Sequence, residues 1–258
     1  MKTRLLLLML TLFWAACQST DPTPFVTDPQ LERYSDEGPV AQKLFCNSVN
    51  CENPFSQEIY SYNPAGQLTR VDQFSRSASG NLELVFYTDY HYASTGQLSG
   101  KIRYGSRSTL ASWIPYDESE YTYTAGLLTQ ERTYFNQYNP EQRVFTGKID
   151  FEFRDGKKVG QRWYDAQQNM IYRVVYAYKN NTLIGETWYD ATDKISRRFE
   201  HRFSGTSRQI SEYLPNSTEQ ISLVEKTYDS QGRLSSEETK VINPILCSMQ
   251  AGVVRYVY

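Results

Sequence analysis

This chain of 258 residues has only two histidines, and neither acidic nor basic residues are in large excess. Lys and Arg together number 27 and Asp and Glu 29, so the formal net charge is −2. This balance excludes a protein that binds nucleic acid through bulk positive charge. The histidines, His91 and His201, are both distant from any cysteine in the sequence, which argues against a zinc site.

Motifs that mark common active sites are absent as well. The chain has no glycine-rich phosphate loop, no nucleophile elbow, no paired zinc motif and no calcium loop of spaced aspartates. Its acidic residues occur in pairs along predicted strands, for example Glu118 with Glu120 and Asp150 with Glu152, a pattern typical of a solvated sheet face. We therefore expect no enzyme activity, no metal and no cofactor.

Tyrosine is abundant instead. The chain has 21 tyrosines, 12 phenylalanines and 4 tryptophans, which makes 14% of it aromatic. Aromatic and β-branched side chains pack well on a half-buried sheet surface. The composition therefore favours an all-β fold and argues against an all-α one.

The first seventeen residues resemble an export signal. Lys2 and Arg4 precede an apolar run, residues 5–16, that is too short to span a bilayer as a mature helix. The sequence Phe-Trp-Ala-Ala before Cys17 resembles the cleavage box of bacterial lipoproteins, in which the cysteine carries the lipid. We expect residues 1–16 to be removed as a signal peptide and Cys17 to be lipidated, with ordinary signal cleavage as the alternative.

A tether and a cysteine-containing segment follow the signal. Residues 17–40 contain several Pro and Asp and few large apolar side chains, so we expect a lipidated N-terminus and flexible tether. Residues 41–57 form a lead-in to the folded body. In an oxidising compartment Cys46 and Cys51 can form a short-loop disulfide, whereas pairing of either with Cys247 would join the two ends of the chain. The spacing leaves both pairings open.

Self-comparison reveals a repeat through the rest of the chain, residues 58–258. In most copies two aromatic residues, two positions apart, precede a turn with Gly or Asn and then an aliphatic residue. We call the second aromatic of each copy its anchor; the seven anchors are Tyr62, Tyr92, Tyr123, Phe153, Tyr178, Phe203 and Tyr228. Their spacings are 30, 31, 30, 25, 25 and 25 residues.

Each copy has the pattern of a β-hairpin, with two alternating strands joined by a polar turn. Same-face sets are expected along the second strands, such as Val159, Gln161 and Trp163. Seven hairpins make about fourteen strands, a sheet on the order of 65 Å wide, which would twist, curl or close. The predicted fold is therefore all-β: an antiparallel meander of about seven repeated hairpins in a wide twisted or curled sheet, open or partly closed.

The last copy resembles the YD repeat of bacterial Rhs proteins and related wall-associated and toxin proteins. Tyr228-Asp229, Gly232 and Leu234 match the Tyr-Asp dipeptide, the glycine and the leucine of that repeat, and the resemblance extends over roughly residues 58–240. In that family the repeats build a long antiparallel sheet that coils into a shell. The resemblance thus implies an extracytoplasmic β-meander.

Repetition separates structural aromatics from candidate binding residues. Aromatics that recur in every copy are expected in the core, because residues that bind a ligand should differ between copies; an exposed platform for stacking sugars is the alternative. Trp113, Trp163 and Trp188 are specific to single units and are the candidate ligand-surface residues. His91 and His201 are expected to be ordinary strand positions.

Signal, tether and repeats together predict an exported protein, lipid-anchored in the bacterial cell envelope at the outer membrane, that acts as a non-catalytic interaction or structural surface. Its expected partners are the membrane, through the lipid on Cys17, and an envelope protein or a polysaccharide, with no nucleic acid. Two alternatives are a carbohydrate-binding accessory protein of the cell surface and a remnant of an Rhs-type toxin shell.

Overall fold

The computed structural model describes residues 39–106, 113–136, 142–244 and 251–258, all within one compact unit, Asp36–Tyr258. The predicted signal peptide, the predicted lipidation site Cys17 and the third mature cysteine, Cys247, lie outside the described residues. Within these ranges there is no helix of the length and apolarity needed to cross a membrane.

The described residues form β-strands that pair antiparallel with their neighbours. Their bounds are β1 Gln42–Cys46, β2 Ser56–Tyr62, β3 Leu68–Arg76, β4 Leu82–Tyr92, β5 Leu98–Ser106, β6 Trp113–Thr124, β7 Leu127–Phe135, β8 Val144–Arg154, β9 Lys157–Asp165, β10 Met170–Lys179, β11 Thr182–Asp190, β12 Ile195–Ser204, β13 Ser207–Tyr213, β14 Gln220–Tyr228, β15 Leu234–Val241 and β16 Gly252–Val257.

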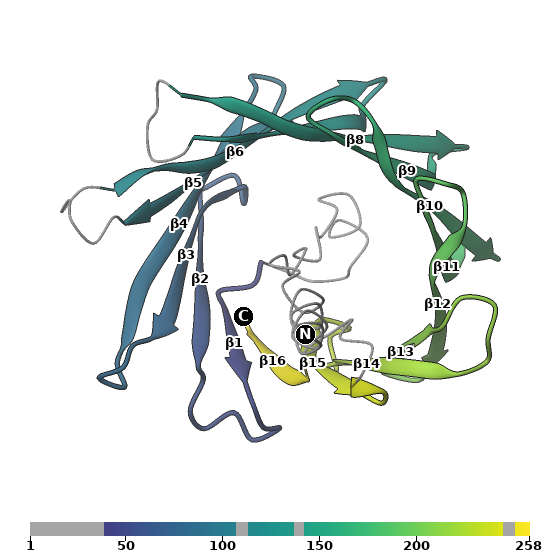
Figure 1. Ribbon diagram of the computed structural model, residues 1–258. Coiled ribbons are helices and arrows are strands. Elements are labelled where there is room, and N and C mark those ends of the chain that lie inside the picture. Colours follow the sequence, from purple (N-terminus) through teal and green to yellow (C-terminus); the bar gives the residue numbers. More distant parts are fainter. Residues whose placement is uncertain (1–38, 107–112, 137–141, 245–250) are drawn as a thin grey trace, which may run out of the picture. The chain divides into compact units, whose positions relative to one another are not determined.

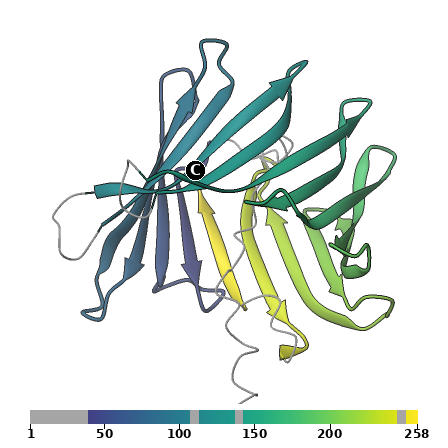
Figure 2. The ribbon, with the colours of Figure 1, turned by 45° about the horizontal axis from the view of Figure 1, so that its top comes forward.

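These strands follow one another in sequence order around a closed barrel, which β16 completes by pairing with β1 (Figures 1 and 2). The predicted antiparallel meander is confirmed, and the seven predicted hairpins run from β2–β3 to β14–β15. The sequence predicted about fourteen strands and left the closure of the sheet open. The sheet has two further strands, and with them it closes.

The two ends of the chain supply those strands as an eighth unit. The end of β16 and the residue after it read Tyr256-Val257-Tyr258, an aromatic pair like those of five of the seven copies, and Tyr258 lies 30 residues after Tyr228. β1, which lies in the cysteine-containing lead-in, pairs antiparallel with β16, with Gln42 opposite Val257. The barrel closes because this unit takes one strand from each end of the chain.

Side chains within the turns set the hairpin geometry. In the turn between β2 and β3 the Asn63 side-chain oxygen accepts hydrogen bonds from the backbone N–H groups of Ala65 and Gln67, at 3.0 and 2.9 Å. Gly66 in the same turn has a φ of 76°, which glycine adopts without steric cost. Asp229 holds the last turn in the same way, so the aspartate of the Tyr-Asp dipeptide is a turn residue.

A β-bulge changes which residues share a face. In six of the seven hairpins the register shifts just before the anchor, and β12–β13 is the exception. The extra residue lies in the second strand. In β9 it is Val159, so Lys158 and not Val159 shares a face with Gln161 and Trp163. The predicted same-face set was therefore wrong at Val159, because the sequence pattern does not reveal a one-residue bulge.

A buried apolar cluster lies on β5 to β8. It comprises Leu98, Tyr121, Leu128, Ile149 and Phe151, with partly buried aromatics from neighbouring hairpins packed against it. Leu128 is only 1% exposed. This cluster lies on one face of the sheet, and the other face of the same strands is polar.

Candidate functional site

Cross-strand pairing sorts the side chains of the barrel wall into two sets, because neighbouring residues of a strand point to opposite faces. Most buried strand residues belong to one set, for example Leu128, Ile149, Phe151 and Val174. Closing a sheet brings the side chains on its concave side together, so the buried set faces the inside of the barrel. We call this set the inner wall and the opposite set the outer wall.

Anchor tyrosines lie on the inner wall and join each hairpin to the one before it. In four units the tyrosine hydroxyl donates a hydrogen bond to a backbone carbonyl oxygen of the preceding unit. The donor and acceptor residues are Tyr62 and Val40 (2.8 Å), Tyr92 and Leu68 (2.8 Å), Tyr178 and Lys158 (2.9 Å), and Tyr258 and Leu234 (2.9 Å). The recurring tyrosines therefore have a structural role, and the split unit at the chain ends uses the same bond.

Two hairpins depart from the repeat on the inner wall. The residue opposite the anchor is a leucine in five of the seven hairpins, but it is Lys158 in β8–β9 and Arg208 in β12–β13. Close by are Glu186 and His201. Because residues that only build the wall should recur, these four form the candidate site, which we call the polar sector.

His201 is the centre of the polar sector, with a side chain only 2% exposed. Its Nε2 lies 3.2 Å from Glu186 Oε1, and its Nδ1 lies 2.5 Å from the guanidinium of Arg208. A guanidinium can only donate, so Nδ1 accepts and the ring proton is assigned to Nε2, facing the carboxylate. Both ring nitrogens therefore face a charged side chain, Glu186 on one side and Arg208 on the other.

Glu186 stays charged despite its position. Burial raises the pKa of this carboxyl, but the hydrogen bond from His201 lowers it, with help from the Trp188 N–H and the charge of Lys158, and the pKa ends below its ordinary value. The Trp188 Nε1 lies 3.4 Å from Glu186 Oε2. The sector thus holds a carboxylate fixed among bases on the inner wall.

Lys158 is held by aromatic rings as well as by charge. It is 6% exposed, and its ammonium lies 4.8 Å from the centre of the Tyr176 ring and 5.4 Å from that of Phe151. These contacts stabilise a desolvated cation. The sequence signal for the sector is the departure from the repeat itself, at the leucine position and, in His201, at the first aromatic position.

The outer wall carries ion pairs along the middle of its strands. Each joins a base and an acid on the same or a neighbouring strand. The pairs include Arg70 with Asp72, Lys148 with Asp150 and Arg162 with Glu152, each at 2.7 Å, and Lys240 with Glu225.

A second series of aromatics lies on the outer wall, and bases cover these rings. Tyr104, Tyr134, Tyr164 and Tyr189 recur at spacings of 30, 30 and 25 residues, a series that sequence reasoning missed although the spacing reveals it. The base and ring pairs are Arg143 over Tyr134 (3.5 Å), Arg173 over Tyr189 (4.1 Å) and Lys148 over Tyr164 (4.6 Å), while Arg70 lies 3.7 Å over Tyr87, which stacks on Tyr104. Ring faces covered in this way are not open to a sugar.

The three candidate ligand-surface tryptophans are divided between the two walls. Trp163 and Trp188 share the inner wall, where Tyr172, opposite Trp163, packs against Trp188 with ring centres 6.3 Å apart. Trp113 is on the outer wall, with its ring 5.2 Å from that of Tyr87. Trp163 packs against the buried cluster of the inner wall, and Trp188 contacts Glu186 in the polar sector. The structure does not bring all three together into one surface.

The lead-in segment, residues 41–57, contains one disulfide. Cys46 and Cys51 form a disulfide, with Cα atoms 5.2 Å apart, between the end of β1 and the loop that follows. Among the described residues, no group of three or more His, Cys, Asp or Glu side chains is placed to hold a metal ion.

Comparison with protein-family models and with curated proteins finds no match for this chain. Among solved structures, it is similar to a porin-like protein from Bacteroides vulgatus ATCC 8482, with 9% identity and a TM-score of 0.47 over 85% of this chain and 98% of that one. It is also similar to a porin-like protein from Bacteroides uniformis ATCC 8492, with 11% identity and a TM-score of 0.39 over 85% of this chain and 97% of that one. A chain of the TcdB2-TccC3 structure has 12% identity and a TM-score of 0.31 over 84% of this chain and 13% of that one. At these values the similarities carry no argument about function.

Proposed function

We propose that this chain is an exported, lipid-anchored protein of the cell envelope whose barrel stays in water and presents its outer wall as a non-catalytic interaction surface. The observation that carries the proposal is the series of ion pairs along the middle of the outer wall. Those positions would face lipid if the barrel spanned a bilayer.

The cost of inserting such a wall supports a barrel that stays outside the membrane. A transmembrane barrel has an outward apolar band about 25 Å tall, and an Arg or Lys at its midplane costs about 2–4 kcal/mol. Arg70, Lys148 and Arg162 all lie within strands on the outer wall. We expect several such residues with their acids to outweigh the gain from outward apolar side chains such as Val175 and Ile59.

A lipid on Cys17 would attach such a barrel without inserting it. Each buried methylene contributes about 0.8 kcal/mol, and two or more chains give stable attachment. The tether expected at residues 17–40 would then hold the barrel beside the bilayer. The proposed lack of catalysis rests on the polar sector, where the ring of its one histidine, His201, lies between Glu186 and Arg208.

The experiment compares the full-length protein with Cys17→Ser in a host that has an outer membrane. The native protein is expected in the membrane fraction, and the variant in the soluble periplasmic fraction. Cys247→Ser is the matched control and is expected to remain with the membrane. A Cys17→Ser protein that resists extraction by alkaline carbonate would show instead that the barrel spans the bilayer.

We further propose that the repeats belong to the YD class. The support is the shared unit: a Tyr anchor on the inner wall, an Asx turn at Asn63 or Asp229 and a leucine opposite the anchor. Asp229→Ala is expected to loosen the last hairpin turn, and amide hydrogen exchange at Gln231 and Arg233 would measure this. Unchanged exchange at these two amides would show that the Asp229 side chain does not hold the turn, and the turn would then no longer support membership of the YD class.

A further inference from the structure

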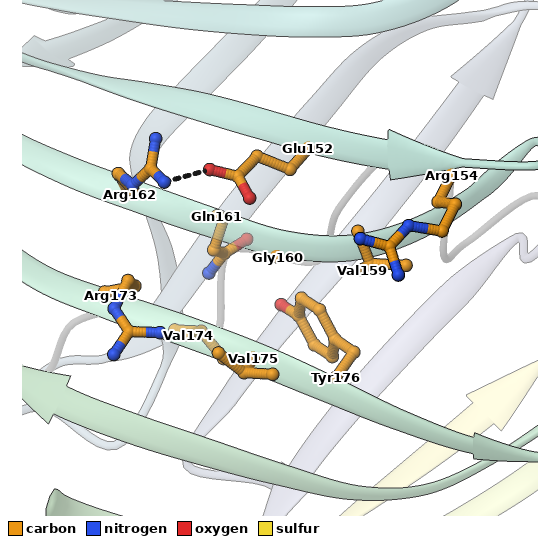
Figure 3. Close-up of a pocket in the computed structure, with 10 residues that line it drawn as sticks. All are labelled: Glu152, Arg154, Val159, Gly160, Gln161, Arg162, Arg173, Val174, Val175 and Tyr176. Atoms are coloured by element: carbon orange, nitrogen blue, oxygen red, sulfur yellow. Dashed lines mark ion pairs between the residues drawn. The ribbon is translucent and has the colours of Figure 1, made fainter.

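The outer wall has a hollow over β8, β9 and β10 that the ion pairs described above do not fill. Its volume is about 310 Å³, near the lower limit for small-molecule sites. Figure 3 shows it with the strands of the opposite wall behind, so it is seen from outside the barrel. The side chains that matter are Glu152, Arg154, Arg162, Arg173 and Val175.

Glycine makes the space. A Cβ atom at Gly160 would lie 3.1 Å from the Val174 carbonyl oxygen and 3.4 Å from a carboxylate oxygen of Glu152. Gly100 and Gly185 hold the same place in two other hairpins, where the following strand approaches as closely. Glycine thus stands at this place in three of the seven hairpins, and the arginines around Gly160 distinguish β8–β9 from the other two.

The charge around the hollow is positive on balance. Arg162 pairs with Glu152 at 2.7 Å, and Arg173 pairs with Asp193 at 3.0 Å. In the described part of the chain no ion pair is formed by Arg154, whose guanidinium lies beside Val159 in Figure 3. A guanidinium has more N–H donors than one carboxylate uses, so donors remain for an added oxyanion.

The hollow also has an apolar side. Val159 and Val175 both line it, and Val175 is 37% exposed. An exposed valine beside guanidinium groups with remaining N–H donors suits a ligand with a carbon skeleton and one anionic group. The size of the hollow fits one ring or one short chain and excludes a polymer segment of several units.

The geometry points to a binding site for a small organic anion, a carboxylate or phosphate-bearing molecule whose oxyanion contacts Arg154 and whose carbon skeleton lies on Val159 and Val175. This site stands on the hollow alone and does not depend on how the barrel is attached to the envelope.

Calorimetric titration of the full-length protein in detergent tests the site, with glucuronate and inorganic phosphate as separate probes. At least one probe is expected to bind, and Arg154→Gln is expected to weaken binding by about tenfold or more, the effect of losing one charge-assisted hydrogen bond. Arg202→Gln, the same substitution at an outer-wall arginine outside the hollow, is the control and is expected to leave affinity unchanged. Gly160→Ala, which fills the hollow, is expected to weaken binding several-fold without removing a charge.

The two probes separate the sources of the oxyanion. Binding of glucuronate alone assigns a carboxylate with its skeleton, binding of phosphate alone assigns a free phosphate or phosphate ester, and both outcomes support the site. Binding of neither probe at millimolar concentration overturns it. Equal losses in Arg154→Gln and Arg202→Gln would also overturn it, since they would reflect general attraction to a basic surface.

Discussion

The inner and outer walls of this barrel are built from alternate residues of the same strands, yet they follow different rules. On the inner wall aromatics and leucines recur in each unit, and four tyrosine hydroxyls bond to the neighbouring unit. On the outer wall aromatics recur too, but bases cover them and ion pairs lie between them. The difference teaches that repetition alone does not mark a core, whereas repetition with burial does.

Polar groups on the two walls also differ in what they contribute. Glu131 and Glu212 on the inner wall are 2% and 1% exposed; Glu131 lies 3.4 Å from the Tyr121 hydroxyl, and the Ser222 hydroxyl donates to Glu212 at 2.8 Å. Removing a partner from such a buried group costs more than removing one from an exposed pair. The predictions below use this contrast, from the largest effect to the smallest.

Truncating an apolar residue should separate the walls most clearly. Leu128→Ala removes a side chain that is 1% exposed on the inner wall, and we expect it to lower the free energy of unfolding by about 2–5 kcal/mol. Ile184→Ala, at a bulge residue that is 40% exposed, is expected to change it by about 0.5 kcal/mol. Urea unfolding of both proteins measures the difference, and equal losses would contradict the assignment of the walls.

Neutralising the buried carboxylate of the polar sector should come next. Glu186→Gln removes the charge facing His201, and a loss of about 1–3 kcal/mol is expected. Glu200→Gln on the outer wall, where the side chain is 42% exposed, is the control and should cost little.

The same variant gives a pH test. Because the pKa of Glu186 lies below its ordinary value of 4.5, its contribution to stability is complete above that pH and is lost as the pH falls through the lower folded value. Acidification from pH 6 to about pH 3 should therefore destabilise the native protein more than Glu186→Gln. Parallel stability curves for the two proteins would show that the carboxylate is not held as described.

Removing one anchor hydroxyl is a smaller change. Tyr92→Phe deletes the hydrogen bond to the Leu68 carbonyl and should cost about 0.5–1.5 kcal/mol. Tyr164→Phe is the matched control, since its hydroxyl makes no hydrogen bond within the described residues. Thermal unfolding compares them, and an effect of Tyr164→Phe as large as that of Tyr92→Phe would remove the special role of the anchors.

The smallest effect is expected from an outer ion pair. Lys240 pairs with Glu225 and Glu238, and its side chain is 46% exposed. Lys240→Gln should cost at most about 0.5 kcal/mol, and the cost should vanish in high salt. A larger loss that persists in salt would place this pair among the buried groups.

The seven hairpins could be predicted because each carries its own anchor, turn and leucine within one stretch of sequence. Closure could not, because the eighth unit is divided between β16 and β1, and no single segment contains both of its strands. The bulge at Val159 was also beyond sequence reasoning, since an apolar residue next to Lys158 fits the alternating pattern in either register.

The candidate site could be predicted only in part. His201 was expected to be an ordinary strand position, and its contacts with Glu186 and Arg208 depend on side chains from β11 and β13. Lys158 and Arg208 could have been found as the bases in a leucine position. The hollow at Gly160 could not, because it depends on how closely β10 approaches β9.

Fluorescence of a probe on the outer wall tests the central claim most directly. Single cysteines at Thr122, Thr187 and Thr227, each in a Cys247→Ser background, would carry an environment-sensitive label in the full-length protein reconstituted with lipid vesicles. Emission typical of water is predicted at all three positions. A shift to the emission typical of hydrocarbon at any of these positions, and most directly at Thr187 in the middle of β11, would contradict the account, because it would show that the outer wall faces lipid.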